Sequence, residues 1–236
     1  TAYPEFGMPS PADVDILESI IPPEELWPPA PGTSWESHHA FKAWERDTWL
    51  MQEVIEDYFG PSGNLEELVR NGQLLQGEGY KAIYEEARRQ KPYCSMALNW
   101  CFNEAWPAAA NNSLVSYPTR PKPALEAVGQ SCRPVLASAR NYRFSHSAGQ
   151  EFSCQLWLLN DSQEALEAGR MKASLRWSGG EAELGSWEFT EVQANTNLAG
   201  PDLNLELSSL PRGLFRLELE VQGREAWNSV YQFMKA

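Results

Sequence analysis

Residues 93–107 read YCSMALNWCFNEAWP, and this stretch decides the fold of the first half of the chain. Its part 93–102 is almost continuously apolar and uncharged, which is typical of a strand buried on both faces in a parallel α/β sheet. A polar loop, residues 103–107, follows directly. Because barrel enzymes carry their active sites in the loops after buried strands, we expect functional side chains here.

Helices are predicted on the N-terminal side of this strand. Ser10, followed by Pro11 and Asp13, predicts a helix start. Apolar spacing predicts helices over 37–58 and 64–89, the second with a possible kink at its glycines. Residues 22–36 hold five prolines and two tryptophans, which predicts a loop that either borders a functional site or packs against the fold.

The pattern changes after Pro134, where short strands alternate with turn signals. Strands are predicted over 134–140, 151–159, 171–177, 184–191, 203–207, 213–222 and 227–234. Seven short strands in about 100 residues are typical of an immunoglobulin-like β-sandwich.

Composition excludes several classes of function. The chain has 236 residues and a net charge of −13, from 19 basic and 32 acidic residues. With no basic patch, we expect no nucleic-acid partner, and with no apolar run of about 18 residues, no membrane insertion. Four cysteines without CxxC spacing and three histidines indicate buried thiols and no metal site.

Several short segments, in their order along the chain, carry a resemblance to a known family. These are PEFGMPS (4–10), WESHH (35–39), the helix with Gln73 and Gln76, LNWCFNEAWP (98–107) and KPA (122–124). Together they resemble family 2 glycoside hydrolases of the β-mannosidase and exo-β-glucosaminidase branch. The resemblance implies that the first half is the last two βα units of a TIM (β/α)8 barrel, covering barrel strands seven and eight.

The resemblance also implies a set of site residues and a chemistry. Glu5 corresponds to the catalytic nucleophile, and Trp100 to a platform under the sugar ring. Asn103 and Trp106 correspond to residues that line the subsite of the reacting sugar. Retaining glycosidases use one carboxylate as nucleophile and a second as acid and base. No organic or metal cofactor is implied.

The sequence departs from the family pattern at two positions, and one catalytic group is missing. Pro4 stands where a small residue such as Ser is usual, and Glu104 where Asp is usual. The family's acid/base Glu follows an Asn at the fourth strand, which would precede Thr1. Asn103-Glu104 resembles that dipeptide, but we reject it because no strand remains after it to supply a nucleophile.

The sequence therefore predicts an α/β barrel portion over 1–130 and an immunoglobulin-like domain over 131–236. The expected function is hydrolysis of terminal β-mannosides or related β-glycosides by a longer parent enzyme, with this chain alone inactive and the N-terminal domains of the parent as its partner. A small carbohydrate is the expected substrate, and a periplasmic or secreted location is favoured. The alternatives are a non-catalytic carbohydrate-binding or interaction module built on the sandwich, and a structural spacer.

Overall fold

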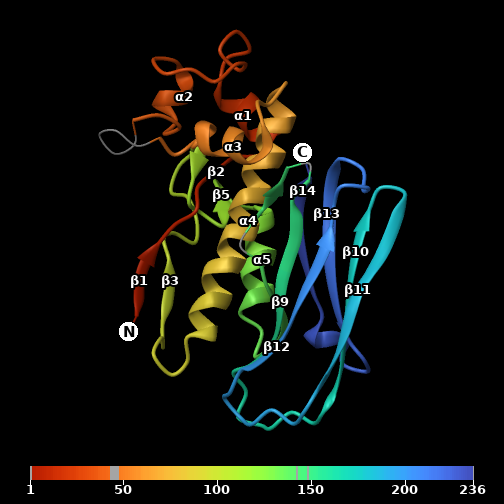
Figure 1. Ribbon diagram of the computed structural model, residues 1–236. Coiled ribbons are helices and arrows are strands. Elements are labelled where there is room, and N and C mark those ends of the chain that lie inside the picture. Colours follow the sequence, from red (N-terminus) through yellow and green to blue (C-terminus); the bar gives the residue numbers. More distant parts are fainter. Residues whose placement is uncertain (1, 43–47, 142, 148, 236) are drawn as a thin grey trace. The chain divides into compact units, whose positions relative to one another are not determined.

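The computed structural model describes residues 2–42, 48–141, 143–147 and 149–235 (Figure 1). The chain divides into two compact units. The N-terminal unit comprises residues 2–80 and 96–128, and the sandwich unit comprises 81–95 and 129–235. The predicted assignment of 1–130 and 131–236 to a barrel portion and an immunoglobulin-like domain stays a prediction. Within the described residues, no helix has the length and apolar character needed to cross a membrane.

The N-terminal unit combines helices with short pairs of strands. Strands β1 and β3 pair in parallel, whereas β2 pairs with β4 and β5 with β6 antiparallel. The elements are β1 (Tyr3–Phe6), β2 (Ser10–Pro11), α1 (Val14–Ile20), α2 (Ser34–Ser37), α3 (Gln52–Phe59), α4 (Leu65–Arg89), β3 (Ala97–Asn99), β4 (Ala110–Asn111), β5 (Val115–Ser116), β6 (Arg120–Pro121) and α5 (Pro123–Ser131). Helices α4 and α5 each end with residues that belong to the sandwich unit.

Two helix predictions for this unit are wrong. Ser10 does not cap a helix, because it pairs with Asn111 in the β2–β4 ladder and Asp13 is the N-cap of α1. The single helix predicted over 37–58 is instead two short helices, α2 and α3. Lys42 and Met51 adopt left-handed φ angles of 54° and 49°, which no right-handed helix accommodates. Part of that prediction, 43–47, lies outside the described residues.

The strand predicted over 93–102 is shorter and less buried than expected. Strand β3 covers three residues, and the side chains of Leu98, Trp100 and Phe102 are 50%, 48% and 62% exposed. The physical reason is that, among the described residues, β3 pairs with a single strand, β1, instead of lying between two strands as in a complete sheet.

Helix α4 runs unbroken over 25 residues, as the sequence predicts, although it contains three glycines. Two of them permit close approach of the segment after β1. A methyl group at Gly72 would lie 2.5 Å from Cδ of Pro11, and one at Gly79 would lie 2.6 Å from Cε of Met8. These glycines therefore allow residues 8–11 to pack directly on the helix.

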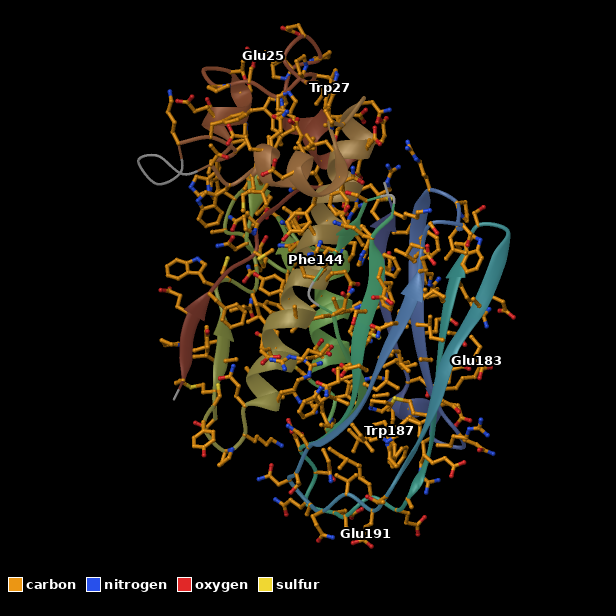
Figure 2. All side chains as sticks on the ribbon, in the orientation of Figure 1. Glu25, Trp27, Phe144, Glu183, Trp187 and Glu191 are labelled. Carbon is orange, nitrogen blue, oxygen red and sulfur yellow. The ribbon has the colours of Figure 1, made fainter. Side chains whose placement is uncertain are left out.

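The Pro-rich loop is held to the N-terminal unit through Trp35. The Trp35 side chain is fully buried, and its Nε1 donates to the carbonyl of Glu25 over 3.0 Å. The Glu25 carboxylate accepts the backbone N–H of Ser34 over 2.7 Å. Trp27, in the same loop, is partly exposed (Figure 2). The loop is therefore packed against the unit at Trp35 and exposed to solvent at Trp27.

The sandwich unit contains two sheets. One has the order β11-β10-β13-β14-β8, and the other β12-β9-β7. All pairs are antiparallel except β14 with β8. The strands are β7 (Val135–Arg140), β8 (Ser145–His146), β9 (Glu151–Asn160), β10 (Gly169–Trp177), β11 (Gly180–Phe189), β12 (Leu198–Glu206), β13 (Gly213–Val221) and β14 (Ser229–Lys235), with a 3-10 helix over Glu225–Trp227. All seven predicted strands are present, and β8 is additional.

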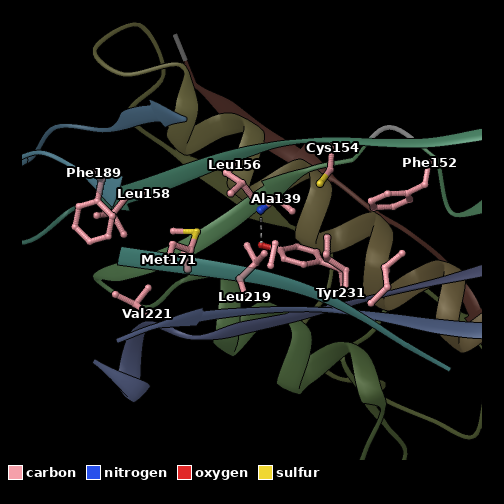
Figure 3. Packing of buried hydrophobic residues seen from close by; sticks show 14 of the residues in the cluster. Ala139, Phe152, Cys154, Leu156, Leu158, Met171, Phe189, Leu219, Val221 and Tyr231 are labelled. Carbon is pink, nitrogen blue, oxygen red and sulfur yellow. Dashed lines mark hydrogen bonds between the residues drawn. The ribbon is translucent and has the colours of Figure 1, made fainter. Parts of the chain in front are cut away.

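The core of this unit lies between the two sheets (Figure 3). The rings of Phe152, Phe215 and Phe233 stack, with centroids 4.8 Å and 5.4 Å apart along the series. The Tyr231 hydroxyl accepts the backbone N–H of Ala139 over 3.1 Å, which links β14 to β7. Side chains of both sheets thus enclose one apolar layer, which is the organisation of a β-sandwich.

The last turns of α4 join the sandwich unit through a buried carboxylate. Glu85 accepts hydrogen bonds from the hydroxyls of Ser131, Ser138 and Tyr231, and pairs with Arg89 over 3.4 Å. Burial raises the pKa of Tyr231. Because both charged side chains are almost fully buried, this network is a specific attachment of the helix end to the sheets.

Candidate active site

A cavity of about 230 Å³ opens where β1 and β3 end in the N-terminal unit. It is lined by two polar side chains, two tryptophans and the strand end itself: Glu5, Phe6, Gly7, Trp49, Trp100 and Asn112. Two of the four residues predicted from the sequence, Glu5 and Trp100, therefore share this cavity. Of the lining side chains, Glu5 provides the one carboxylate.

Backbone hydrogen bonds to the segment around β3 hold the strand end that carries Glu5. Tyr3 N donates to Met96 O and Trp100 N donates to Phe6 O, each over 2.8 Å. The Phe6 ring packs against Tyr80 of α4, with centroids 6.1 Å apart. The register between β1 and β3 shifts between Tyr3 and Phe6, and in this irregular strand end Glu5 lines the cavity beside Phe6.

Two polar side chains of α4, Gln76 and Tyr80, form hydrogen bonds with the chain on either side of the cavity. Gln76 Nε2 donates to Met8 O over 2.7 Å and to Ser113 O over 3.2 Å. The Tyr80 hydroxyl accepts from Met8 N over 3.3 Å and donates to Asn112 O over 2.6 Å. Both side chains are fully buried. The helix thus ties the segment after Glu5 to the loop that contains Asn112.

Gly7 and Asn112 are in direct contact. A Cβ atom at position 7 would lie 2.5 Å from Cγ of Asn112 and 3.0 Å from the carbonyl oxygen of Trp100. No side chain larger than hydrogen fits between them. The absence of a side chain at Gly7 therefore brings the Asn112 carboxamide next to the strand end that carries Glu5.

The other two predicted residues do not line this cavity. Asn103 is exposed, and its Nδ2 donates to the carbonyl of Glu104 over 3.3 Å. Trp106 is 42% exposed and stacks on His38 at 5.8 Å with an interplanar angle of 21°. His38 Nδ1 lies 2.8 Å from Pro107 O, which holds the ring beside the loop.

An imidazole connects the cavity wall to Trp106. His39 packs against Trp49, with ring centroids 4.9 Å apart, and against Trp106, at 6.1 Å. Partial burial lowers the pKa of His39, opposed by the negative charge of Glu104. The neutral imidazole is therefore the favoured form between the two indoles.

The Glu104 carboxylate is buried and interacts with groups inside the N-terminal unit. Its buried carboxylate accepts from Ser113 Oγ over 2.5 Å and from the Tyr117 N–H over 3.0 Å, and lies 3.5 Å from Nζ of Lys122. Burial lowers the pKa of Lys122, and the Glu104 charge opposes this. All of these interactions are internal, which agrees with rejecting Glu104 as the acid/base. Across the described residues, no group of three or more His, Cys, Asp or Glu could hold a metal ion.

Sequence reasoning did not select Trp49 and Asn112 as site residues. Trp49 counted as an apolar position of a helix that does not form there, and Asn112 lies in a loop without a motif of its own. The signal that could have found Asn112 is its position shortly after the motif 98–107. Nothing local in the sequence singles out Trp49.

No family model matches the chain. The chain is 30% identical over 109 residues to β-mannosidase B of Aspergillus flavus, which covers 43% of this chain and 13% of that protein. With β-mannosidase B of Aspergillus fumigatus it shares 29% identity over 103 residues, covering 40% and 12%. The matched segment therefore spans only about an eighth of the length of these relatives.

Solved structures with a similar fold include a β-mannosidase and an exo-chitosanase. The β-D-mannosidase of Dictyoglomus thermophilum superposes with a TM-score of 0.67 at 20% identity, over 98% of this chain and 27% of that one. An exo-chitosanase of Amycolatopsis orientalis, in complex with PNP-β-D-glucosamine, gives 0.71 at 18% identity, with the same coverage. Sequence and fold thus confirm the resemblance: part of the chain is similar in sequence to β-mannosidase B, and nearly all of it shares the fold of part of a β-D-mannosidase and of an exo-chitosanase.

Proposed function

We propose that the N-terminal unit is the last part of a (β/α)8 barrel, with β1 and β3 as its neighbouring seventh and eighth strands. The parallel pairing of these strands, with α4 in the connection between them, supports this assignment. Helix α4 packs on one face of β1 through Tyr80 and Phe6. In a barrel, helices cover the outside, and the cavity that Glu5 lines would then belong to the inner, catalytic end of the barrel.

The sandwich unit is then the immunoglobulin-like domain. Its sheets combine strands in the orders β11-β10-β13-β14-β8 and β12-β9-β7. Its first two strands lie in opposite sheets, β7 beside β9 and β8 beside β14. This topology supports the assignment beyond the strand count.

The proposed activity is hydrolysis of terminal β-glycosides with retention of configuration. The observation that carries it is the cavity shared by Glu5 and Trp100, where the two parallel strands end. Polar groups at the carboxyl ends of parallel strands are the standard catalytic location in such folds. An indole beside a carboxylate suits a sugar, which has an apolar ring face and a reactive anomeric carbon.

The mechanism has two displacements. The Glu5 carboxylate attacks the anomeric carbon while the bond to the leaving oxygen breaks, and an acid donates its proton to that oxygen. Water then attacks the glycosyl ester and gives its proton to the same group, now a base, which releases the sugar and regenerates Glu5. Trp100 and Trp49 would bind the ring, with Asn103 and Trp106 further along the same loop.

The acid/base belongs to a segment outside this chain in our proposal. Glu104 is engaged in internal interactions, and among the described residues no second carboxylate lines the cavity. The structural relatives are nearly four times as long as this chain, and so have room for such a segment. We therefore expect the 236-residue chain alone to give no turnover of unactivated β-glycosides.

Hydrolysis of 4-nitrophenyl β-D-mannoside and β-D-glucosaminide by the full-length gene product tests the proposal. We expect turnover that Glu5→Gln reduces by several orders of magnitude, because the nucleophile is lost. Glu18→Gln, at an exposed position of α1, is the matched control. Full activity in Glu5→Gln would refute the role of Glu5.

One observation bears on the alternative that the sandwich unit is a carbohydrate-binding module. A cavity of about 470 Å³ lies on the sandwich unit, lined mainly by polar and charged residues of β10, β11 and the turn after β13. Among them Lys172 and Glu183 already pair over 3.3 Å. No aromatic side chain of the described residues lines this cavity, so it lacks the stacking platform that sugar-binding sites use, and we favour the enzyme portion.

A further inference from the structure

We propose that Asn112 is a substrate-binding residue, whose carboxamide forms a hydrogen bond with a polar substituent of the sugar beside Glu5. This inference rests on the proposed function and extends it to a residue that no sequence motif indicated. Three features carry it: the place of Asn112 in the cavity, the unused hydrogen-bonding capacity of its side chain, and the way its backbone is held.

The Asn112 side chain lines the same cavity as Glu5. Contact with Gly7 places its carboxamide two residues along the chain from the carboxylate-bearing position. The other lining side chains are aromatic. Sugar-sized sites combine apolar walls with a few convergent polar groups that set orientation. Asn112 is the one neutral polar side chain of the cavity, and hence the candidate for that role.

The loop does not need this carboxamide for its own conformation. The backbone carbonyl of Asn112 accepts the hydrogen bond from Tyr80, and the neighbouring Ser113 carbonyl accepts from Gln76. For the Asn112 side chain itself, no hydrogen-bond partner is found among the described residues. The position is thus set by main-chain contacts, and the side chain retains two donors and an acceptor.

The chemistry defines the ligand class. A carboxamide donates to and accepts from hydroxyl groups and accepts from an ammonium group, so it fits a neutral hexose or an amino sugar. Because Asn112 is next to the strand end of Glu5, the contact would involve a substituent of the ring that reacts, not of a more distant sugar unit. Asn112 would therefore influence which ring substituents the site accepts.

The test measures sugar binding to the full 236-residue chain by saturation-transfer NMR, with methyl β-D-mannoside and methyl β-D-glucosaminide as probes. Removing one neutral hydrogen bond is expected to raise the Kd in Asn112→Ala by roughly two- to tenfold. Asn112→Asp, of nearly the same shape, removes both donors and is also expected to weaken binding of the neutral mannoside. Asn204→Ala, on an exposed face of β12, is the control and should leave the Kd unchanged.

The outcomes separate this inference from the proposed function. If the unmodified chain binds a probe and both Asn112 variants bind it with the same Kd, the role of Asn112 is refuted and the sugar site stands. If the unmodified chain binds neither probe, the proposed site is refuted and the role of Asn112 with it. Circular dichroism verifies that each variant is folded. If Asn112→Ala does not fold, the comparison with Asn112→Asp still decides the role of Asn112.

Discussion

Two glycines of α4 should respond in opposite directions to the same substitution. In a helix interior, Gly→Ala normally stabilises by about 1 kcal/mol. At Gly77 the nearest atom to an added methyl group is Cβ of Ala127 at 3.7 Å, which is ordinary contact. Gly77→Ala should therefore raise the free energy of unfolding by up to about 1 kcal/mol.

At Gly72 the added methyl group would overlap with a rigid neighbour. It would lie 2.5 Å from Cδ of Pro11 and 3.0 Å from Cδ1 of Ile55, so the proline ring must move by about 1 Å to restore normal contact. Overpacking of this kind costs about 1–3 kcal/mol. That exceeds or cancels the propensity gain, and the two variants should differ by about 1–3 kcal/mol in stability.

Urea unfolding of both variants, followed by far-UV circular dichroism, measures this difference through the transition midpoint. Helical content should be similar in the two proteins, because the helix itself gains from either alanine. Equal midpoints, or a Gly72→Ala protein more stable than Gly77→Ala, would refute the packing of the segment after β1 on α4. That packing is what holds the strand end of Glu5.

Further predictions concern the Glu85 network and the His39 cluster. Glu85→Ala should cost about 2–5 kcal/mol of unfolding free energy, because three buried hydroxyls lose their acceptor while Arg89 retains Glu86 as a partner at 3.4 Å. Glu86→Ala, at a position one-third exposed, should cost under about 1 kcal/mol; similar urea midpoints would contradict this. His39 has a pKa below 6.5 in the folded protein, so the unfolded chain binds more protons and stability should fall as the pH drops below about 6.5. In His39→Asn, which tolerates the left-handed φ of 77° at this position, that part of the pH dependence should vanish, and an unchanged slope between pH 7.5 and 5.5 would count against it.

The sequence predicted the sandwich strands and α4 well because their signals are local. Alternation along strands such as 213–222 and the apolar stripe of α4 repeat over many residues. The failures arose where contacts distant in sequence decide. Ser10 pairs with Asn111 instead of capping a helix, and the strand 93–102 is mostly exposed because too few strands pair with it here.

The candidate site was only partly predictable for a related reason. Glu5 and Trp100 belong to motifs that resemble a family, and so could be selected from the sequence. Trp49 and Asn112 reach the cavity through packing against His39 and through main-chain hydrogen bonds to α4. Neither interaction leaves a periodic or motif-like signal in the chain.

The central claim is that Glu5 is the nucleophile of a retaining β-glycosidase. The most direct test treats the full-length gene product with a 2-deoxy-2-fluoro-β-mannosyl fluoride, whose fluorine slows hydrolysis of a glycosyl ester while its leaving group needs little acid assistance. Peptide mass spectrometry then locates the added sugar. We expect one label, on the peptide containing Glu5, and none in Glu5→Gln. A label on another carboxylate of a protein that remains active would contradict it.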